Sequence, residues 1–94
     1  MHPTTVSPRF PLGQILVAPN AQEQLETAEV RAALRRHARG DWGEAKPDEV
    51  ADNERGLREA GGVFSIFRDR RDQRFCVMTN GNRSATLVVA WTAD

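Results

Sequence analysis

Residues 62–91, GVFSIFRDRRDQRFCVMTNGNRSATLVVAW, decide the fold. Three runs rich in Val, Ile, Phe and Thr, at residues 62–68, 74–79 and 84–91, are separated by two polar segments. The second of these, Asn80-Gly81-Asn82, is a hairpin signal, because Asn-Gly readily takes the positive φ of a type I′ turn. We therefore expect three consecutive antiparallel strands. The last run is apolar on both faces, which favours a central place in the sheet.

Two helical patterns precede these strands. Thr27 is a suitable N-cap, apolar residues recur at helical spacing after it, and Gly40 is the expected residue just beyond the helix. Pro47 then fits the first position of a second helix, where its missing N–H costs nothing, and this helix is expected to end near Ala60.

The N-terminal part is less regular. Residues 1–11 contain three prolines and predict a flexible arm, whereas residues 12–17, Leu-Gly-Gln-Ile-Leu-Val, predict a short strand. A single helical turn is expected at residues 21–25, after Asn20 as its N-cap. The predicted fold is therefore α+β over one domain, residues 12–94: a short N-terminal strand, two to three helices and a three-stranded antiparallel meander.

Charge and cysteine content restrict the function. The 94 residues include 13 basic and 13 acidic side chains, so the formal charge is zero, and direct nucleic-acid binding is not favoured. Cys76 is the only cysteine and cannot form an internal disulfide; its apolar neighbours predict a buried thiol. The chain shows neither a signal peptide nor a membrane-spanning run, so we expect a cytoplasmic protein without membrane contact.

One polar turn stands out, His37-Ala38-Arg39-Gly40-Asp41-Trp42-Gly43, followed by Asn53 on the next helix. One interpretation is acid–base chemistry by His37 oriented by Asp41. The favoured interpretation is a structural tether, in which a buried His37 donates to a carbonyl or to Asp41, Asn53 ties the turn to the helix, and Trp42 closes one end of a small core.

Arginines gather around the two expected hairpin turns, where they could bind phosphate or an acidic protein surface. The competing interpretation is a solvated hairpin tip that resists edge-to-edge aggregation. The candidate partner-binding residues are Arg68, Arg70, Arg71, Arg74 and Arg83.

Other chemistry finds little support. His2 and His37 are far apart, no ligand pair has metal spacing, and Gly61-Gly62 precedes a strand rather than a phosphate-binding helix. We therefore predict no catalytic residues, no metal and no cofactor.

The chain resembles a family of small proteins carried by plasmids, phages and integrative elements of bacteria, some of them labelled type I restriction subunits. The resemblance covers most of residues 12–90, and its most specific part is the His-x-x-Gly-Asp-Trp-Gly turn. The chain departs from the family pattern at Gly62, at Phe67 and at Asn80-Gly81-Asn82, where the family has a basic residue, an aromatic hydroxyl and acidic residues. The matching positions are His37, Gly40, Asp41, Trp42, Gly43, Asn53, Glu54, Leu57, Ser65, Thr79, Arg83, Ser84, Thr86 and the start Leu12-Gly13-Gln14-Ile15, and Phe67 matches only in being aromatic.

This resemblance and the absence of a catalytic set imply a non-enzymatic mobile-element or phage protein that binds a protein or ribonucleoprotein partner. An anti-CRISPR or anti-restriction modulator is the specific expectation. The alternative is a RelE/ParE-like toxin acting on ribosome-bound mRNA or on gyrase, although such toxins tend to be basic and this chain has one lysine and no tyrosine. A homodimeric structural component is a third hypothesis, because the thin apolar helix face and the two-sided last strand leave apolar surface to cover.

Overall fold

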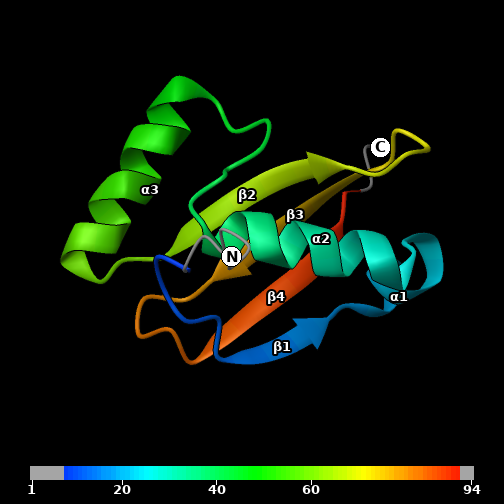
Figure 1. The fold of residues 1–94 in the computed structure, drawn as a ribbon, viewed down its shortest axis with the longest axis horizontal. Coiled ribbons are helices and arrows are strands. Elements are labelled where there is room, and N and C mark those ends of the chain that lie inside the picture. Colours follow the sequence, from blue (N-terminus) through cyan, green and yellow to red (C-terminus); the bar gives the residue numbers. More distant parts are fainter. Residues whose placement is uncertain (1–7, 92–94) are drawn as a thin grey trace, which may run out of the picture.

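The computed structural model describes residues 8–91 and has the expected α+β architecture, with three helices and one four-stranded sheet (Figure 1). In chain order the elements are β1 (Gln14–Val17), α1 (Pro19–Gln24), α2 (Thr27–Ala38), α3 (Pro47–Glu59), β2 (Val63–Arg68), β3 (Arg74–Thr79) and β4 (Ala85–Ala90).

The strand order is β1-β4-β3-β2, so the three C-terminal strands form the predicted meander and β4 is central, as its two apolar faces suggested. The short N-terminal strand β1 pairs parallel with β4, with Val17 opposite Val88, which makes the sheet mixed rather than purely antiparallel. This long-range pairing brings together the two ends of the domain and leaves β1 and β2 as the two edges.

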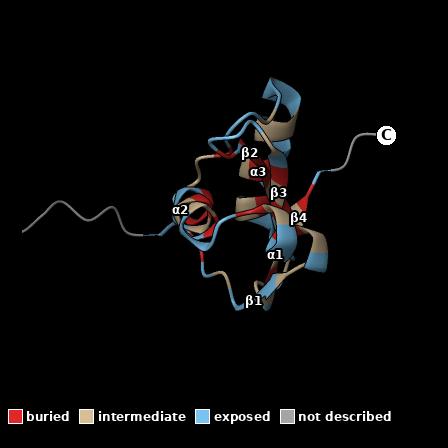
Figure 2. Cartoon of the chain, turned by 90° about the vertical axis from the view of Figure 1, so that its right-hand side faces the viewer, coloured by how far each residue is buried: buried red, intermediate tan, exposed pale blue. Residues whose placement is uncertain are grey.

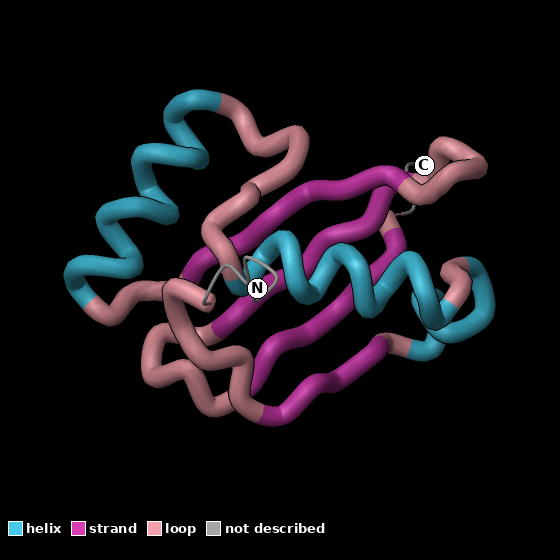
Figure 3. Tube along the Cα trace, viewed as in Figure 1, coloured by secondary structure: helices cyan, strands magenta, loops and turns pink. Residues whose placement is uncertain are grey.

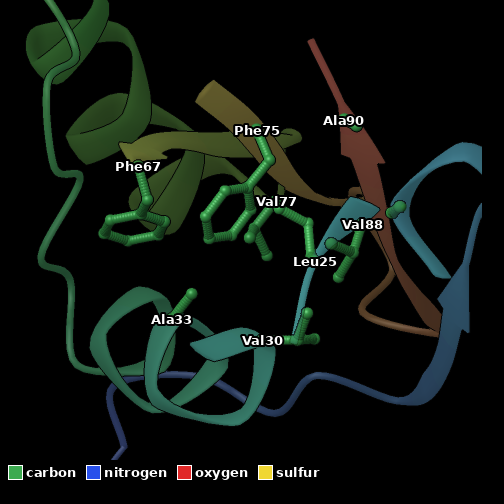
Figure 4. Close-up of a cluster of buried hydrophobic side chains, with 9 residues drawn as sticks. Leu25, Val30, Ala33, Phe67, Phe75, Val77, Val88 and Ala90 are labelled. Carbon is green, nitrogen blue, oxygen red and sulfur yellow. The ribbon is translucent and has the colours of Figure 1, made fainter. Parts of the chain in front are cut away.

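The elements form two layers. α2 lies over one face of the sheet, and α3 lies beside the β2 edge (Figures 1 and 3). α1 follows β1 along the outer edge of β4, where the Asn20 amide bonds the backbone of Ala90. Because side chains alternate along a strand, every second residue of β2, β3 and β4 points toward the helices. These inward residues meet the apolar face of α2 in the main core, shown in Figure 4. The core consists of Ala21, Leu25, Val30, Ala33, Phe67, Phe75, Val77, Val88 and Ala90.

Several local expectations need correction. At the β3–β4 turn, positive φ falls on Arg83 (61°) rather than on the Asn-Gly pair, so the turn is not type I′. Arg83 N–H donates to the carbonyl of Asn80 (3.1 Å), and the Asn80 side chain accepts from the backbone of Ser84 and Ala85. The side-chain acceptor therefore closes a longer loop than the two-residue turn that Asn-Gly suggested.

The N-terminal segment also differs from the expected arm. Residues 1–7 lie outside the described residues, but Phe10 is buried and packs beside Trp42 and Val63 in a second, smaller apolar cluster. Arg9 anchors the same segment through two hydrogen bonds to Glu54 (2.8 and 3.0 Å). Residues 8–11 are thus held against the domain.

The helix boundaries shift slightly. α1 begins at Pro19, with Ala18 rather than Asn20 at the N-cap, and Thr27 is the first residue of α2 rather than its cap. Gly40 does adopt a positive φ (83°) just beyond α2, as expected, and Pro47 begins α3.

Candidate functional site: a buried histidine chain and an open sheet face

His37 lies in the last turn of α2 and points into the sheet, where its side chain is 0% exposed. Its two ring nitrogens meet hydroxyls from two different strands. Nδ1 is 2.5 Å from Ser65 Oγ on β2, and Nε2 is 2.9 Å from Thr79 Oγ1 on β3. Both ring nitrogens are therefore satisfied inside the core.

The donor and acceptor of each of these hydrogen bonds can be assigned by starting from Thr86, whose hydroxyl lies next to that of Thr79. Thr86 Oγ1 donates its single proton to the carbonyl of Leu12 (2.7 Å), so it accepts from Thr79 Oγ1 (2.7 Å). Thr79 has then used its own proton and accepts from Nε2–H of His37, which leaves Nδ1 to accept from Ser65. The result is one directed chain from Ser65 through His37 to Leu12.

This environment keeps His37 uncharged. Burial first, and then the positive charge of Arg83, lower the pKa of the imidazole to about 4. The rings of Phe10 and Trp42 meet His37 edge-on, with centroids 5.2 and 5.6 Å away. An imidazole sealed by aromatic rings has no path to a substrate, so the geometry favours the tether interpretation over acid–base chemistry.

The partners of the polar turn differ from those expected. Asp41 does not contact His37 with its carboxylate, which instead binds Arg36 (2.7 Å) and accepts from the backbone N–H of Gly43 (3.0 Å). Arg36 holds the pKa of the Asp41 carboxyl below its usual range. Trp42 is buried as expected, and its Nε1 donates to Glu54 (3.0 Å).

Asn53 also has another partner than predicted. It lies on the inner side of α3, but its amide bonds both backbone groups of Phe64, at 2.7 and 3.0 Å. The side chain thus imitates a neighbouring strand at the β2 edge. Nearby, Ile66 pairs with the backbone of Trp42 and Glu44, with Gly43 between them at a φ of 66°. Backbone and amide groups together cover the β2 edge.

The five arginines are split between the two ends of the sheet. Arg68, Arg70, Arg71 and Arg74 surround the β2–β3 turn, whereas Arg83 belongs to the opposite turn and donates to the carbonyls of Gly61, Asn80 and Gly56. Arg83 is therefore committed to holding the backbone together.

The four arginines at the β2–β3 end also have partners within the chain. Arg68 binds Glu44 and Asp72, and Arg70 binds Glu26. Arg71 donates to the carbonyl of Gln24, while Arg74 lies over the ring of Trp91 with its guanidinium carbon 5.7 Å from the centroid. Asp69 and Glu44 also lie 3.9 Å from Arg71 and Arg74, so each of the four arginines has a carboxylate nearby that offsets its charge.

The sheet face turned away from α2 was anticipated from the sequence only for the last strand, whose two apolar faces leave surface to cover. Strand alternation and register place apolar side chains on it from all four strands, and Figure 2 shows α2 on the opposite side of the sheet. Leu16, Met78 and Trp91 are 43%, 39% and 42% exposed. We call this surface the open face; its residues are Leu16, Phe64, Cys76, Met78, Leu87, Val89 and Trp91.

Cys76 belongs to the open face and is only half-buried, which corrects the prediction of a buried thiol. Burial raises the pKa of the thiol, and the nearby charge of Glu49 raises it further. A raised pKa disfavours the reactive thiolate at neutral pH. Both the open face and the hydroxyl chain had a signal in the sequence, namely apolar residues in both phases of the strands and inward-phase Ser65, Thr79 and Thr86.

Neither a metal centre nor a membrane span is found within residues 8–91. No group of three or more His, Cys, Asp or Glu side chains there could hold a metal ion. The longest of the described helices, α3, has 13 residues and is strongly polar, and none of them could span a bilayer. Comparison with known proteins found no matching family model, no matching curated protein and no matching solved structure.

Proposed function

We propose that the chain is a non-enzymatic protein of a mobile element or phage that binds a protein or ribonucleoprotein partner, as a modulator of a bacterial defence system of the anti-CRISPR or anti-restriction kind. The observation that supports binding is the open face. Apolar side chains from four adjacent strands form one continuous surface, and large exposed apolar surfaces on small proteins mark interaction sites. The mobile-element setting rests on the resemblance at the His37–Gly43 turn.

The open face also has a charged rim suited to orienting a partner. At one end, Glu44, Lys46, Glu49 and Arg74 surround a hollow of about 290 Å³ that reaches Ile66 and Trp91. An apolar centre with a polar rim of both signs is the usual anatomy of a protein interface. Such a rim favours a protein surface of mixed charge over bare nucleic acid.

The test is co-purification from a host with active CRISPR and restriction systems, comparing three tagged proteins. Met78→Lys places a charge in the middle of the open face, and Ala51→Lys adds the same charge at an exposed position of α3. We expect a stoichiometric defence component with the wild type and with Ala51→Lys, and its loss with Met78→Lys. Recovery of the same component with Met78→Lys would reject the open face as the binding surface.

The same experiment separates the proposal from the toxin alternative. A modulator leaves growth of its host unchanged when expressed alone, whereas a RelE/ParE-like toxin stops growth and brings down ribosomes or gyrase. Growth arrest with recovery of either target would overturn the modulator proposal.

The hairpin arginines are proposed as secondary contacts. Arg70 and Arg71 are exposed, and their partners Glu26 and Gln24 lie on the surface, so replacing both arginines by alanine should change the unfolding free energy by no more than about 1 kcal/mol. We expect weaker partner binding by this double variant. Unchanged affinity would remove the arginines from the interface.

A further inference from the structure

The two edges of the sheet differ in whether other parts of the chain cover them. The β2 edge is covered by Asn53 and by the backbone of residues 42–44. In contrast, β1 forms the opposite margin of the sheet, and Figures 1 and 3 show no described element beyond it. Its sequence, Gln-Ile-Leu-Val, contains neither the lysine nor the proline with which exposed edge strands commonly block pairing.

The hydrogen bonds to β4 determine which backbone groups of β1 face outward. Gln14 N–H donates to Ser84 and Ala18 N–H donates to Val88, so alternate residues of β1 bond to β4. Ile15 and Val17 alternate with the residues that bond to β4, so their N–H and C=O groups point away from the sheet. Val17 C=O accepts from Gln22 Nε2 (3.0 Å) and keeps a second lone pair.

We propose that β1 is the docking edge for a second copy of this chain, which pairs through its own β1 in antiparallel orientation. An antiparallel pair matches outward residues with outward residues. Ile15 of each copy then lies opposite Val17 of the other copy. The two Leu16 residues lie opposite each other on the two-fold axis. The two sheets join into one, and the contact is isologous, as in most homodimers.

A hollow beside β1 receives the paired side chain. On the helix side of the sheet, Val17, Ala21, Leu25 and Val30 line an open space of about 340 Å³ together with Gln22 and Thr27. Ile15 of the second copy, placed opposite Val17, lies over this hollow. Ile15 on the helix side and Leu16 on the open face are 40% and 43% exposed in the single chain, so pairing removes apolar surface from water on both sides of the sheet.

Charge favours a second copy over a charged partner. β1 has no ionisable residue, and the chain has a formal charge of zero, so two copies approach without repulsion. A strongly basic or acidic segment would find no counter-charge along this edge. The four residues of β1 span only about 13 Å, so the association should be weak and depend on concentration.

The first test measures molar mass by light scattering or sedimentation equilibrium at increasing concentration. We expect a monomer–dimer equilibrium for the wild type, loss of the dimer in Ile15→Lys, and a retained dimer in Met78→Lys. Ile15 and Met78 have nearly equal exposure but lie on opposite faces of the sheet. A wild type that stays monomeric up to roughly 1 mM, or a dimer lost in Met78→Lys, would overturn edge pairing. Circular dichroism shows whether each variant is folded.

The second test reports the register and needs no destabilising charge. In a Cys76→Ala background, Leu16→Cys places two thiols opposite each other across the axis, with Cα atoms about 4.5 Å apart, within the range of a disulfide. Ile15→Cys faces Val17 instead and lies beyond that range from its own copy. We expect mild oxidation to cross-link Leu16→Cys and not Ile15→Cys. The reverse result, or cross-linking of neither, would refute this register.

Discussion

At the scale of single residues, the buried imidazole of His37 couples the fold to pH. Its pKa is about 4 in the folded chain against an ordinary 6.5, so the unfolded chain binds more protons between these values. Stability therefore rises with pH from about 4 to 6.5 and is fully present above 6.5. The full loss on acidification is about 3 kcal/mol.

This prediction is checked by urea unfolding between pH 5 and 8, with the ring titrated by NMR. The window above pH 5 excludes Glu54, whose pKa Arg9 and Trp42 lower to about 2, so that its own loss of stability falls between about 4.5 and 2. A His37→Gln variant should lose the slope between pH 5 and 6.5. A ring that titrates near its ordinary pKa would contradict the assigned environment.

Also at this scale, Thr79 is the acceptor on which the His37 tautomer depends. Thr79→Val leaves Nε2–H without a partner in the core, and an unsatisfied buried donor costs about 1–3 kcal/mol. Thr27→Val makes the same chemical change at an exposed position and should stay within about 0.5 kcal/mol of the wild type. Equal unfolding free energies for the two variants would argue against the directed chain.

At the scale of elements, the loop between α2 and α3 depends on Gly43, because the loop pairs directly with β2. Its φ is 66°, and a Cβ there would lie 2.0 Å from the carbonyl oxygen of Ile66. Gly43→Ala should therefore cost at least the 1–3 kcal/mol typical of a strained backbone. Gly62→Ala is the matched control, because its Cβ would meet only an ordinary contact, 3.4 Å from Thr79.

Thermal unfolding of the two glycine variants checks this prediction. A clearly lower midpoint for Gly43→Ala, with Gly62→Ala near the wild type, supports the role of the loop in covering the β2 edge. Similar midpoints would mean that the loop detaches from the edge without loss of stability.

At the scale of the whole molecule, the sequence predicted what local pattern controls. Runs rich in Val, Ile, Phe and Thr between polar turns identified β2, β3 and β4, and Pro47 and Gly40 marked helix ends correctly. The sequence analysis did not predict which segments distant in the chain contact each other. The parallel pairing of β1 with β4, the choice of Phe64 as the partner of Asn53, and the hydroxyls around His37 join segments distant in the chain. No spacing rule specifies such pairs, since packing selects them.

The reactivity of the Cys76 thiol, which lies on the open face, reports whether that face is covered. The thiol is half-buried there with a raised pKa, so it should react with a chromogenic disulfide reagent more slowly than an unhindered thiol, and faster as pH rises. A partner on the open face should protect it, whereas pairing through β1 should leave its rate unchanged, because that edge lies across β4 from β3. Measuring the rate against protein concentration, and then with the co-purified partner, separates the two surfaces. Protection by concentration alone would mean that copies meet face to face, and an unprotected thiol in the complex would place the partner elsewhere.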